Sequence, residues 1–246
     1  MTLKQIKLEK FIALRAHIGH QQKILNKTMN SFTLGTQQGT AILNFFYILW
    51  SWERASQILT RAFLYRQKFI ILSTNKLIPN EWIKTLLEWR SHIKDQKYSN
   101  YLGYIGSSWS GGLLSNWSNL WNFSLLVFDN LIKKKHIPKS KYALMKKLSG
   151  RVFKGNQPAF PDFLLALNID ETLLHEARLL RIVSMGLVDS NKDLRYSSLP
   201  IFGNDDSFLL IEFFLNLIEQ SFLLSSREEN ELFYRLIFKK LKVLIV

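Results

Sequence analysis

Hydrophobic and polar residues along this chain alternate between two patterns, one typical of buried strands and one typical of amphipathic helices. A short continuous apolar run at residues 68–73 is typical of a strand buried on both faces, and residues 101–105 predict another short strand. Residues 40–65 read as the entry to a strand followed by a helix, because Trp52, Ala55, Ile58, Leu59 and Ala62 share one helical face. A further helix is predicted at 81–93.

The second half of the chain repeats this alternation. Strands are predicted at 163–168, 181–188 and 197–202, and helices at 171–180 and 205–222. Strands that alternate with helices imply right-handed crossovers and a parallel sheet covered on both faces. The pattern therefore predicts the α/β class.

Three other stretches depart from the alternation. Residues 3–16 predict a short amphipathic helix, and 17–39, rich in Gly, Asn, Gln and Thr, predict a loop. Residues 228–246 predict a final helix with acidic residues first and lysines last, which suits the helix dipole.

Residues 116–157 also break the alternation, and they predict an inserted helical hairpin. Its helices are expected at 120–135 and 141–148, with a break at Pro138. We expect an α/β sheet domain formed by 1–116 and 157–225, a hairpin at 117–156 and a C-terminal helix at 226–246.

The formal net charge of +14 is concentrated in two segments. Residues 130–161 carry nine Lys or Arg and no Asp or Glu, and residues 2–27 carry six against one, so +9 and +5 account for the whole +14. The rest of the chain balances at 18 against 18. A neutral body with two basic segments indicates binding to a polyanion, although a solvated charged face is the simpler alternative.

Composition narrows the class of protein further. The absence of cysteine excludes disulfides, zinc knuckles and thiol catalysis. The apolar runs at 41–50 and 208–218 are short for a membrane span, and the second contains Glu212. Interfacial membrane binding through the basic hairpin, with apolar residues such as Trp121 and Phe123, remains an alternative.

Residues 17–20 read HIGH, which resembles the nucleotide-binding signature of class I aminoacyl-tRNA synthetases. No KMSKS-like partner motif and no phosphate-binding glycine loop accompany it. Carboxylates predicted near strand ends favour an enzyme, and these are Asp170, Glu171, Asp189 and Asp193. A nucleotide-using α/β enzyme is thus the competing hypothesis. Asp205 and Asp206 are expected to cap a helix, and we expect no metal site and no cofactor.

Five motifs occur in an order that resembles the universal ribosomal small-subunit protein 2 family. They are HIGHQ from His17, WSGGLLSNW from Trp109, Pro161-Asp162 before a strand, VDSN from Val188 and FGNDD from Phe202. The resemblance runs from about His17 to Phe222. It implies a flavodoxin-like three-layer parallel sheet with a helical hairpin inserted after the Gly-Gly/Asn-Trp segment. It also implies no catalytic role, and a place on the small ribosomal subunit in contact with rRNA and neighbouring ribosomal proteins.

The resemblance and the basic segments together suggest which residues contact rRNA. The candidate RNA-binding residues are His17, His20, Lys23, Lys27, Trp109, Asn116, Lys133, Lys134, Lys135, Lys139, Lys141, Lys146, Lys147, Arg151 and Lys154. We expect no small-molecule substrate, no membrane and no bound metal. Ser107-Ser108 departs from the family, since bacterial members commonly carry a His-Arg pair there.

Several features favour an organellar member of the family. The bias toward Lys, Asn, Ile, Leu and Phe is typical of A/T-rich organellar genes. Residues 3–15 resemble a presequence except for Glu9, and we expect no cleaved import signal. The hairpin is also shorter than in bacterial relatives. We therefore expect a mitochondrially encoded protein of the mitochondrial matrix, with a plastid as the alternative.

Overall fold

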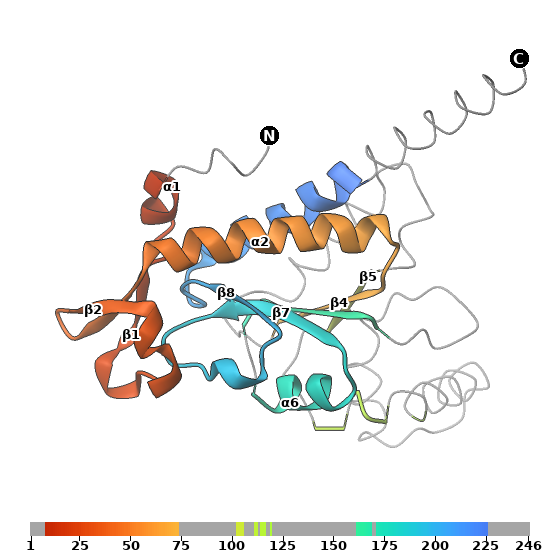
Figure 1. Cartoon of the computed structure of the whole chain (residues 1–246), viewed down its shortest axis with the longest axis horizontal. Helices are drawn as coiled ribbons and strands as arrows, with labels where there is room; N and C mark the ends of the chain where they lie inside the picture. The colour runs from red at the N-terminus through yellow and green to blue at the C-terminus, as the bar shows by residue number, and fades with distance from the viewer. Residues whose placement is uncertain are drawn as a thin grey trace, which may run out of the picture.

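The computed structural model describes residues 8–73, 102–105, 111, 112, 114–116, 119, 161–168 and 171–225. At its centre lies a five-stranded sheet in which every pairing is parallel (Figure 1). Its strands are β4 (Phe69–Leu72), β5 (Leu102–Ile105), β6 (Phe163–Ala166), β7 (Val183–Val188) and β8 (Leu199–Phe202). All five were predicted from the sequence.

The strands lie in the order β5-β4-β6-β7-β8, which is the 2-1-3-4-5 order of flavodoxin-like folds. The α/β class and the flavodoxin-like sheet are therefore confirmed. Pro161-Asp162 helps to set the register of β6 against β4, because the Asp162 carboxylate accepts a hydrogen bond from Lys68 N at 2.9 Å. Phe69 is then paired with Phe163, and their rings lie 5.3 Å apart.

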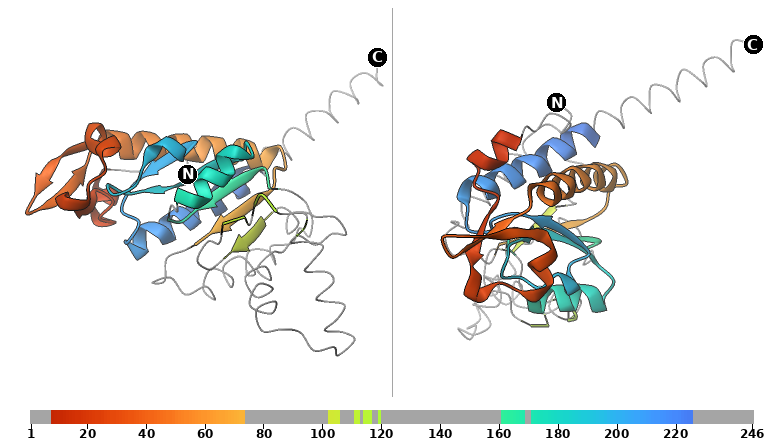
Figure 2. Two further views of the ribbon diagram at one scale, coloured as in Figure 1. Left: turned by 90° about the horizontal axis from the view of Figure 1, so that it is seen from below. Right: turned by 60° about the vertical axis from the view of Figure 1, so that its left-hand side comes forward.

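Helices cover both faces of the sheet. The long helix α2 (Phe45–Leu64) and the last described helix (Phe208–Ser225) lie on one side, and α6 (Glu171–Leu179) lies on the other (Figures 1 and 2). Asn44 starts α2 by accepting a hydrogen bond from Phe46 N at 3.0 Å. Trp52 of α2 packs against Phe213 and Phe214 of the last helix, with ring centroids 5.1 and 5.8 Å apart. A short helix α1 (Leu8–Ala13) inserts Phe11 into the same aromatic cluster.

The outer edge of β8 is closed by side chains of α2. Ser51 Oγ accepts a hydrogen bond from Phe202 N at 3.1 Å, and Trp52 Nε1 donates to the Phe202 carbonyl at 3.0 Å. Pro200 has no N–H to offer at this edge. The edge strand is thereby protected against pairing with another chain.

Residues 17–39 were predicted to form a loop, and that prediction is wrong. They contribute β1 (Ile18–Gln21), the 3-10 helices η2 (Gln22–Ile24) and η3 (Lys27–Phe32), and β2 (Thr33–Gln37). With β3 (Thr40–Leu43), the two strands form an antiparallel sheet in the order β1-β3-β2. We call β1, β2, β3, η2 and η3 together the N-terminal sheet.

The turn at the tip of the N-terminal sheet explains why these residues form strands. Gln37 pairs with Thr40, so Gln38 and Gly39 form a two-residue loop, and both have positive φ, at 51° and 79°. Positive φ at both central residues is the geometry of a type I′ turn, which matches the twist of the strands it joins. The polar residues around this turn had masked the strand pattern.

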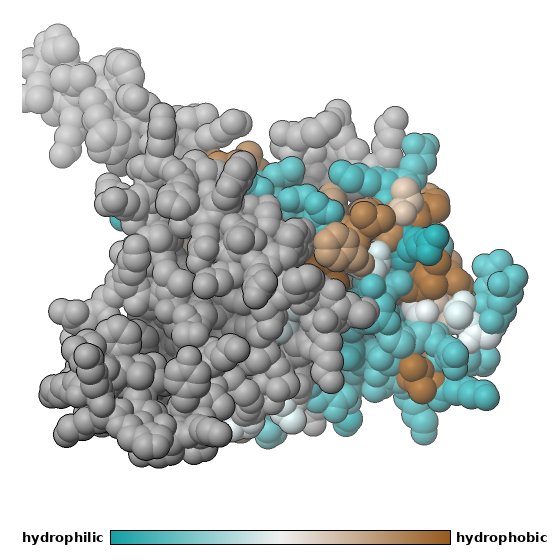
Figure 3. Space-filling model, turned by 180° about the vertical axis from the view of Figure 1, so that it is seen from behind, coloured by the Kyte–Doolittle hydropathy of each residue, from teal (hydrophilic) through white to brown (hydrophobic). Residues whose placement is uncertain are grey.

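The last described helix is long and apolar enough to cross a membrane, which the short run seen in the sequence did not suggest. It packs on the sheet, and Leu210, Phe214 and Leu217 are buried. Figure 3 shows hydrophobic patches set among hydrophilic ones on the described surface seen from behind. Asp205 and Asp206 were expected to cap this helix, but it begins at Phe208, and Ser207 accepts from Leu210 N at 3.4 Å through its hydroxyl.

Other predicted elements lie outside the described residues. These are the helix at 81–93, the C-terminal helix at 226–246 and all of the hairpin at 117–156 except residue 119.

Candidate nucleic-acid interface

The N-terminal sheet is joined to the connection that follows β7 by backbone hydrogen bonds. His20 N donates to Ser190 Oγ at 2.8 Å, and Asn26 N donates to the Ser190 carbonyl at 2.9 Å. The approach is close, since a Cβ at Gly19 would lie 2.6 Å from Ser190 Oγ and 3.1 Å from the Ala41 carbonyl oxygen. Only glycine fits at position 19 without a shift of its neighbours. We call this contact the junction.

The His20 ring lies between two carboxylates at the junction. Its Nδ1 is 3.1 Å from Asp189 Oδ2, and its Nε2 is 3.3 Å from Asp206 Oδ2. The Asp189 side chain is only 1% exposed and follows directly after β7. Contact with Asp189 raises the pKa of His20 above its ordinary value, and the charges of Asp205 and Asp206 add to this effect. The imidazolium form of His20 is therefore more stable here than it is for a free histidine.

A second buried carboxylate lies beside this pair. Burial and the neighbouring Asp189 raise the pKa of Asp205 to about 6, although Lys192 acts in the opposite direction. Lys192 Nζ lies 3.6 Å from Asp205 Oδ2, and Asp205 N donates to Asp189 Oδ2 at 3.4 Å. The junction is thus rich in negative charge and is balanced in part by His20 and Lys192.

The same residues can hold a divalent cation. His20, Asp189 and Asp205 each offer one ligand atom, and these atoms lie within 4.8 Å of one another. One imidazole nitrogen and two carboxylate oxygens form a set that zinc accepts. The sequence showed no ligand cluster around the histidines, because Asp189 and Asp205 lie 169 and 185 residues after His20.

The two histidines of the HIGH motif have different environments. The His17 ring packs against Phe45, with centroids 4.9 Å apart, and burial lowers the pKa of His17. Its carbonyl accepts a hydrogen bond from Leu43 N at 2.8 Å, which ties it to β3. His17 is a packing residue of the N-terminal sheet, whereas His20 belongs to the junction.

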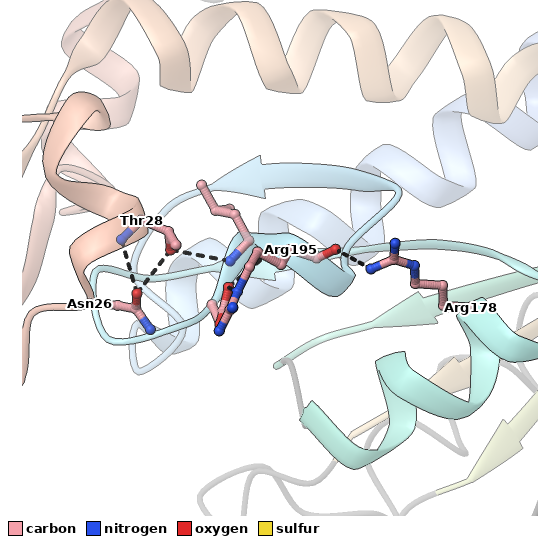
Figure 4. Close-up of polar contacts among 6 residues, drawn as sticks. Asn26, Thr28, Arg178 and Arg195 are labelled. Atoms are coloured by element: carbon pink, nitrogen blue, oxygen red, sulfur yellow. Dashed lines mark hydrogen bonds and ion pairs between the residues drawn. The ribbon is translucent and has the colours of Figure 1, made fainter.

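Next to the junction is an open hollow of about 540 Å³. Its walls come from two segments, residues 23–28 of the N-terminal sheet and Asp193 with Arg195 from the connection between β7 and β8. Thr28 Oγ1 joins the two walls by accepting from Leu194 N at 3.4 Å. Asn26 holds Thr28 in place by accepting from both its N–H and its hydroxyl, at 3.0 and 2.9 Å (Figure 4).

Three cations line this hollow, against one carboxylate. Lys23 and Lys27 are exposed, and Arg195 is 70% exposed at its side chain. Asp193 orients Arg195 by accepting from Nε at 2.9 Å and from Nη2 at 2.6 Å, and these bonds lower the pKa of Asp193. Arg178 of α6 donates to the Arg195 carbonyl at 3.2 Å from the other side (Figure 4). A cationic hollow of this kind suits an anion with several oxygen acceptors.

A third feature anchors the Gly-Gly turn in WSGGLLSNW. The Glu176 carboxylate of α6 accepts from Gly112 N with one oxygen and from Leu114 N with the other, the latter at 3.0 Å. Gly112 has φ of +87°, which favours glycine, and Asn116 N closes the turn by donating to the Gly112 carbonyl at 3.0 Å. The turn that precedes the basic segment is therefore fixed to the sheet domain.

A family model described as ribosomal protein S2 matches residues 11–225. The chain belongs to the ribosomal protein S2 family. Members of the family have a structural role in the small ribosomal subunit and are not enzymes. The resemblance found from the five motifs is confirmed. Three of these motifs, HIGHQ, VDSN and FGNDD, meet at the junction, so in this S2 protein they serve to dock the N-terminal sheet.

The structure brings together only some of the candidate RNA-binding residues. His20, Lys23 and Lys27 lie at or beside the junction, His17 packs inside the N-terminal sheet, and Asn116 is exposed at the Gly-Gly turn. The other candidates lie outside the described residues, and these are Trp109, Lys133, Lys134, Lys135, Lys139, Lys141, Lys146, Lys147, Arg151 and Lys154.

Sequence patterns did not indicate Arg195 or Glu176, and they indicated Ser190 only as a member of the VDSN motif. Ser190 and Glu176 act on partners far along the chain, so no local spacing marks them, and Arg195 reaches the cations of the other wall only in the folded chain. The nearest signal was the Asp-x-Arg spacing of Asp193 and Arg195, which permits a local ion pair.

Proposed function

We propose that this chain is an rRNA-binding structural component of the small subunit of a mitochondrial ribosome. The family match supports the ribosomal role, and the amino-acid bias toward A/T-rich codons supports an organellar gene. Neighbouring ribosomal proteins are its other partners, and they contact the neutral sheet domain.

The charge distribution is the observation that carries the proposal. Residues 2–27 and 130–161 hold the whole net charge of +14, while the remainder is neutral. Lys23 and Lys27, at the end of the first segment, lie beside Arg195 around one hollow. Cations gathered in this way neutralise backbone phosphates, whereas a solubilising charge would be spread over the surface.

Charge reversal tests the role of the basic segment. We expect a Lys133→Glu, Lys134→Glu, Lys135→Glu variant to lose most of its co-sedimentation with the small subunit, because each lysine would then repel an rRNA phosphate. A variant with Arg54, Arg61 and Arg181 changed to Glu is the matched control. These three arginines are exposed in the electrically balanced part of the chain.

The control variant changes the net charge by the same amount as the test variant. Normal incorporation of the lysine variant would contradict the role of the segment in rRNA binding. Equal loss from both variants would show that only total charge matters, which would also contradict it.

The organellar assignment has a separate test. In isolated mitochondria with cytosolic translation blocked, we expect newly labelled chain to appear in the small-subunit fraction of a sucrose gradient. Finding the chain by mass spectrometry only in plastid ribosomes would show that the plastid alternative is correct.

A further inference from the structure

The hollow beside the junction has the features of a site for one anion. Lys23, Lys27 and Arg195 face a common space of about 540 Å³, and Asp193 is the only carboxylate among the residues that line it. Among the ion pairs between described residues, none involves Lys23 or Lys27. Both lysines are exposed and line the hollow, so their ammonium groups can reach a ligand in it.

The groups around the hollow favour phosphate over a carboxylate ligand. Arg195 is held in one orientation by Asp193, and a fixed guanidinium matches the geometry of phosphate oxygens. The ammonium groups of the two lysines add positive charge, and their flexible side chains can adapt to the position of the phosphate oxygens. A singly charged carboxylate has fewer oxygens to share among three cations than a phosphodiester that continues into further phosphates on either side.

The two walls of the hollow are remote in sequence. Leu194 N and Thr28 Oγ1, which join the walls, are 166 residues apart. The cations come together only when the N-terminal sheet is docked, because Lys23 and Lys27 are on one wall and Arg195 is on the other. A ligand that contacts both walls must therefore stabilise the docked state.

We propose that this hollow binds one backbone phosphate of rRNA, and that the bound phosphate holds the N-terminal sheet to the connection between β7 and β8. The inference rests on the proposed rRNA-binding function and adds to it a defined site and a thermodynamic coupling. RNA binding and docking of the N-terminal sheet strengthen each other by the same factor.

Inorganic phosphate is the first probe, titrated into the ¹⁵N-labelled full chain at constant ionic strength. We expect the amide signals of Thr28 and Leu194 to shift, because they lie where the two walls meet. Lys27→Ala and Arg195→Ala should each weaken phosphate binding about tenfold, the usual effect of losing one hydrogen bond to a charged group. Arg61→Ala removes an exposed arginine on α2 and is the matched control.

The coupling is tested with Gly19→Ala, which forces the two walls apart by placing a Cβ against Ser190. This variant keeps every cation of the hollow, and we expect it to bind phosphate several-fold more weakly. Phosphate should also slow hydrogen exchange of the Asn26 amide, which bonds across the junction. Unchanged phosphate affinity in Gly19→Ala would overturn the coupling.

Other outcomes would overturn the site itself. One is that phosphate causes no amide shifts at Thr28 and Leu194. Another is that Arg61→Ala weakens phosphate binding as much as Lys27→Ala and Arg195→Ala do. A third is that polyglutamate competes with phosphate as strongly as single-stranded RNA of equal charge. The last result would assign the hollow to an acidic peptide. If Arg195→Ala binds phosphate as well as the wild type does, while the Lys133–Lys135 reversal still blocks subunit incorporation, the inference is wrong and the proposed function stands.

Discussion

At the scale of single residues, the junction depends on one glycine that allows a close backbone approach and on one buried carboxylate. Gly19 allows the backbone of β1 to approach Ser190, and the buried Asp189 receives the His20 ring. These contacts join the N-terminal sheet to the connection that follows β7. They therefore determine how the N-terminal sheet docks. A change at one of them is expected to act on docking before it acts on the parallel sheet.

Gly19→Ala is expected to lower the free energy of unfolding by about 1–3 kcal/mol, the usual cost of overpacking a tight contact. Denaturant unfolding followed by tryptophan fluorescence measures this change. Ser190→Gly should cost less stability in the Gly19→Ala background than in the wild type, because it loses the bond from His20 N in both but relieves the clash with the new Cβ only in the former. Strict additivity of the two substitutions would show that the clash at Ser190 is not the cause.

A zinc ion held by His20, Asp189 and Asp205 would stabilise the folded chain. At about 100 times its Kd, a ligand bound to one site adds roughly 2.7 kcal/mol to the free energy of unfolding. Thermal unfolding of the chelator-treated chain, with and without zinc, measures the gain. His20→Asn should abolish the gain, while His17→Asn should keep it, because His17 packs against Phe45 instead. Loss of the gain in both variants, or in neither, would place any bound zinc elsewhere.

At the scale of elements, α6 connects two parts of the surface. Glu176 holds the Gly-Gly turn, and Arg178, two residues later, donates to the carbonyl of Arg195 beside the hollow. The helix thereby sets the position of the turn that precedes the basic segment and of one wall of the phosphate site. The helix α6 therefore positions these two segments in addition to covering one face of the sheet.

Glu176→Gln is expected to speed hydrogen exchange at Gly112 and Leu114 by about tenfold or more, since hydrogen bonds to a charged acceptor are worth roughly 1.5–3 kcal/mol. Hydrogen exchange resolved by NMR measures both amides. Glu171→Gln removes a carboxylate from the first turn of the same helix and is the control. Equal exchange rates in wild type and Glu176→Gln would mean that the carboxylate does not hold the turn in solution.

The sequence was informative wherever one local pattern determined the element. The apolar runs that became β4, β6 and β7 are buried on both faces, so their hydrophobicity is continuous and easy to identify. The N-terminal sheet was missed because β1 and β2 are short and mostly unburied, so they show no period-two burial. The Gln38-Gly39 turn was the one local signal for it.

The candidate site was less predictable than the fold. Lys23 and Lys27 were found from charge alone, since a basic segment without acids is visible in the sequence. The roles of Arg195, Ser190 and Glu176 were not predicted, because each acts together with residues of another segment. The strand-end position of Asp189 was predicted, but its contact with His20 required the tertiary structure.

At the scale of the whole molecule, a neutral body carries positive charge in two places. Such a protein is drawn to RNA by charge and is oriented by where the charge lies. Both faces of the described sheet are covered by helices (Figure 2), and the cations of the proposed phosphate site lie on the N-terminal sheet and on the connection after β7.

Binding to rRNA is expected to weaken steeply with salt. If about six phosphates are contacted, the logarithm of affinity should fall with the logarithm of salt concentration at a slope of roughly −4 to −5. Filter binding of labelled small-subunit rRNA over a range of potassium chloride concentrations gives this slope. Arg195→Ala should make it shallower by about 1. A slope near zero would mean that phosphate contacts do not dominate binding.

The distance along the chain between His20 and Ser190, 170 residues, also has a consequence for how the protein is made. At roughly 5–20 residues per second, a ribosome needs about 10–30 seconds to add that many residues. The N-terminal sheet leaves the ribosome early and can form its bonds to Ser190 only after nearly the whole parallel sheet has been synthesised. Docking is thus a late step of folding, and the phosphate site forms only when docking has taken place.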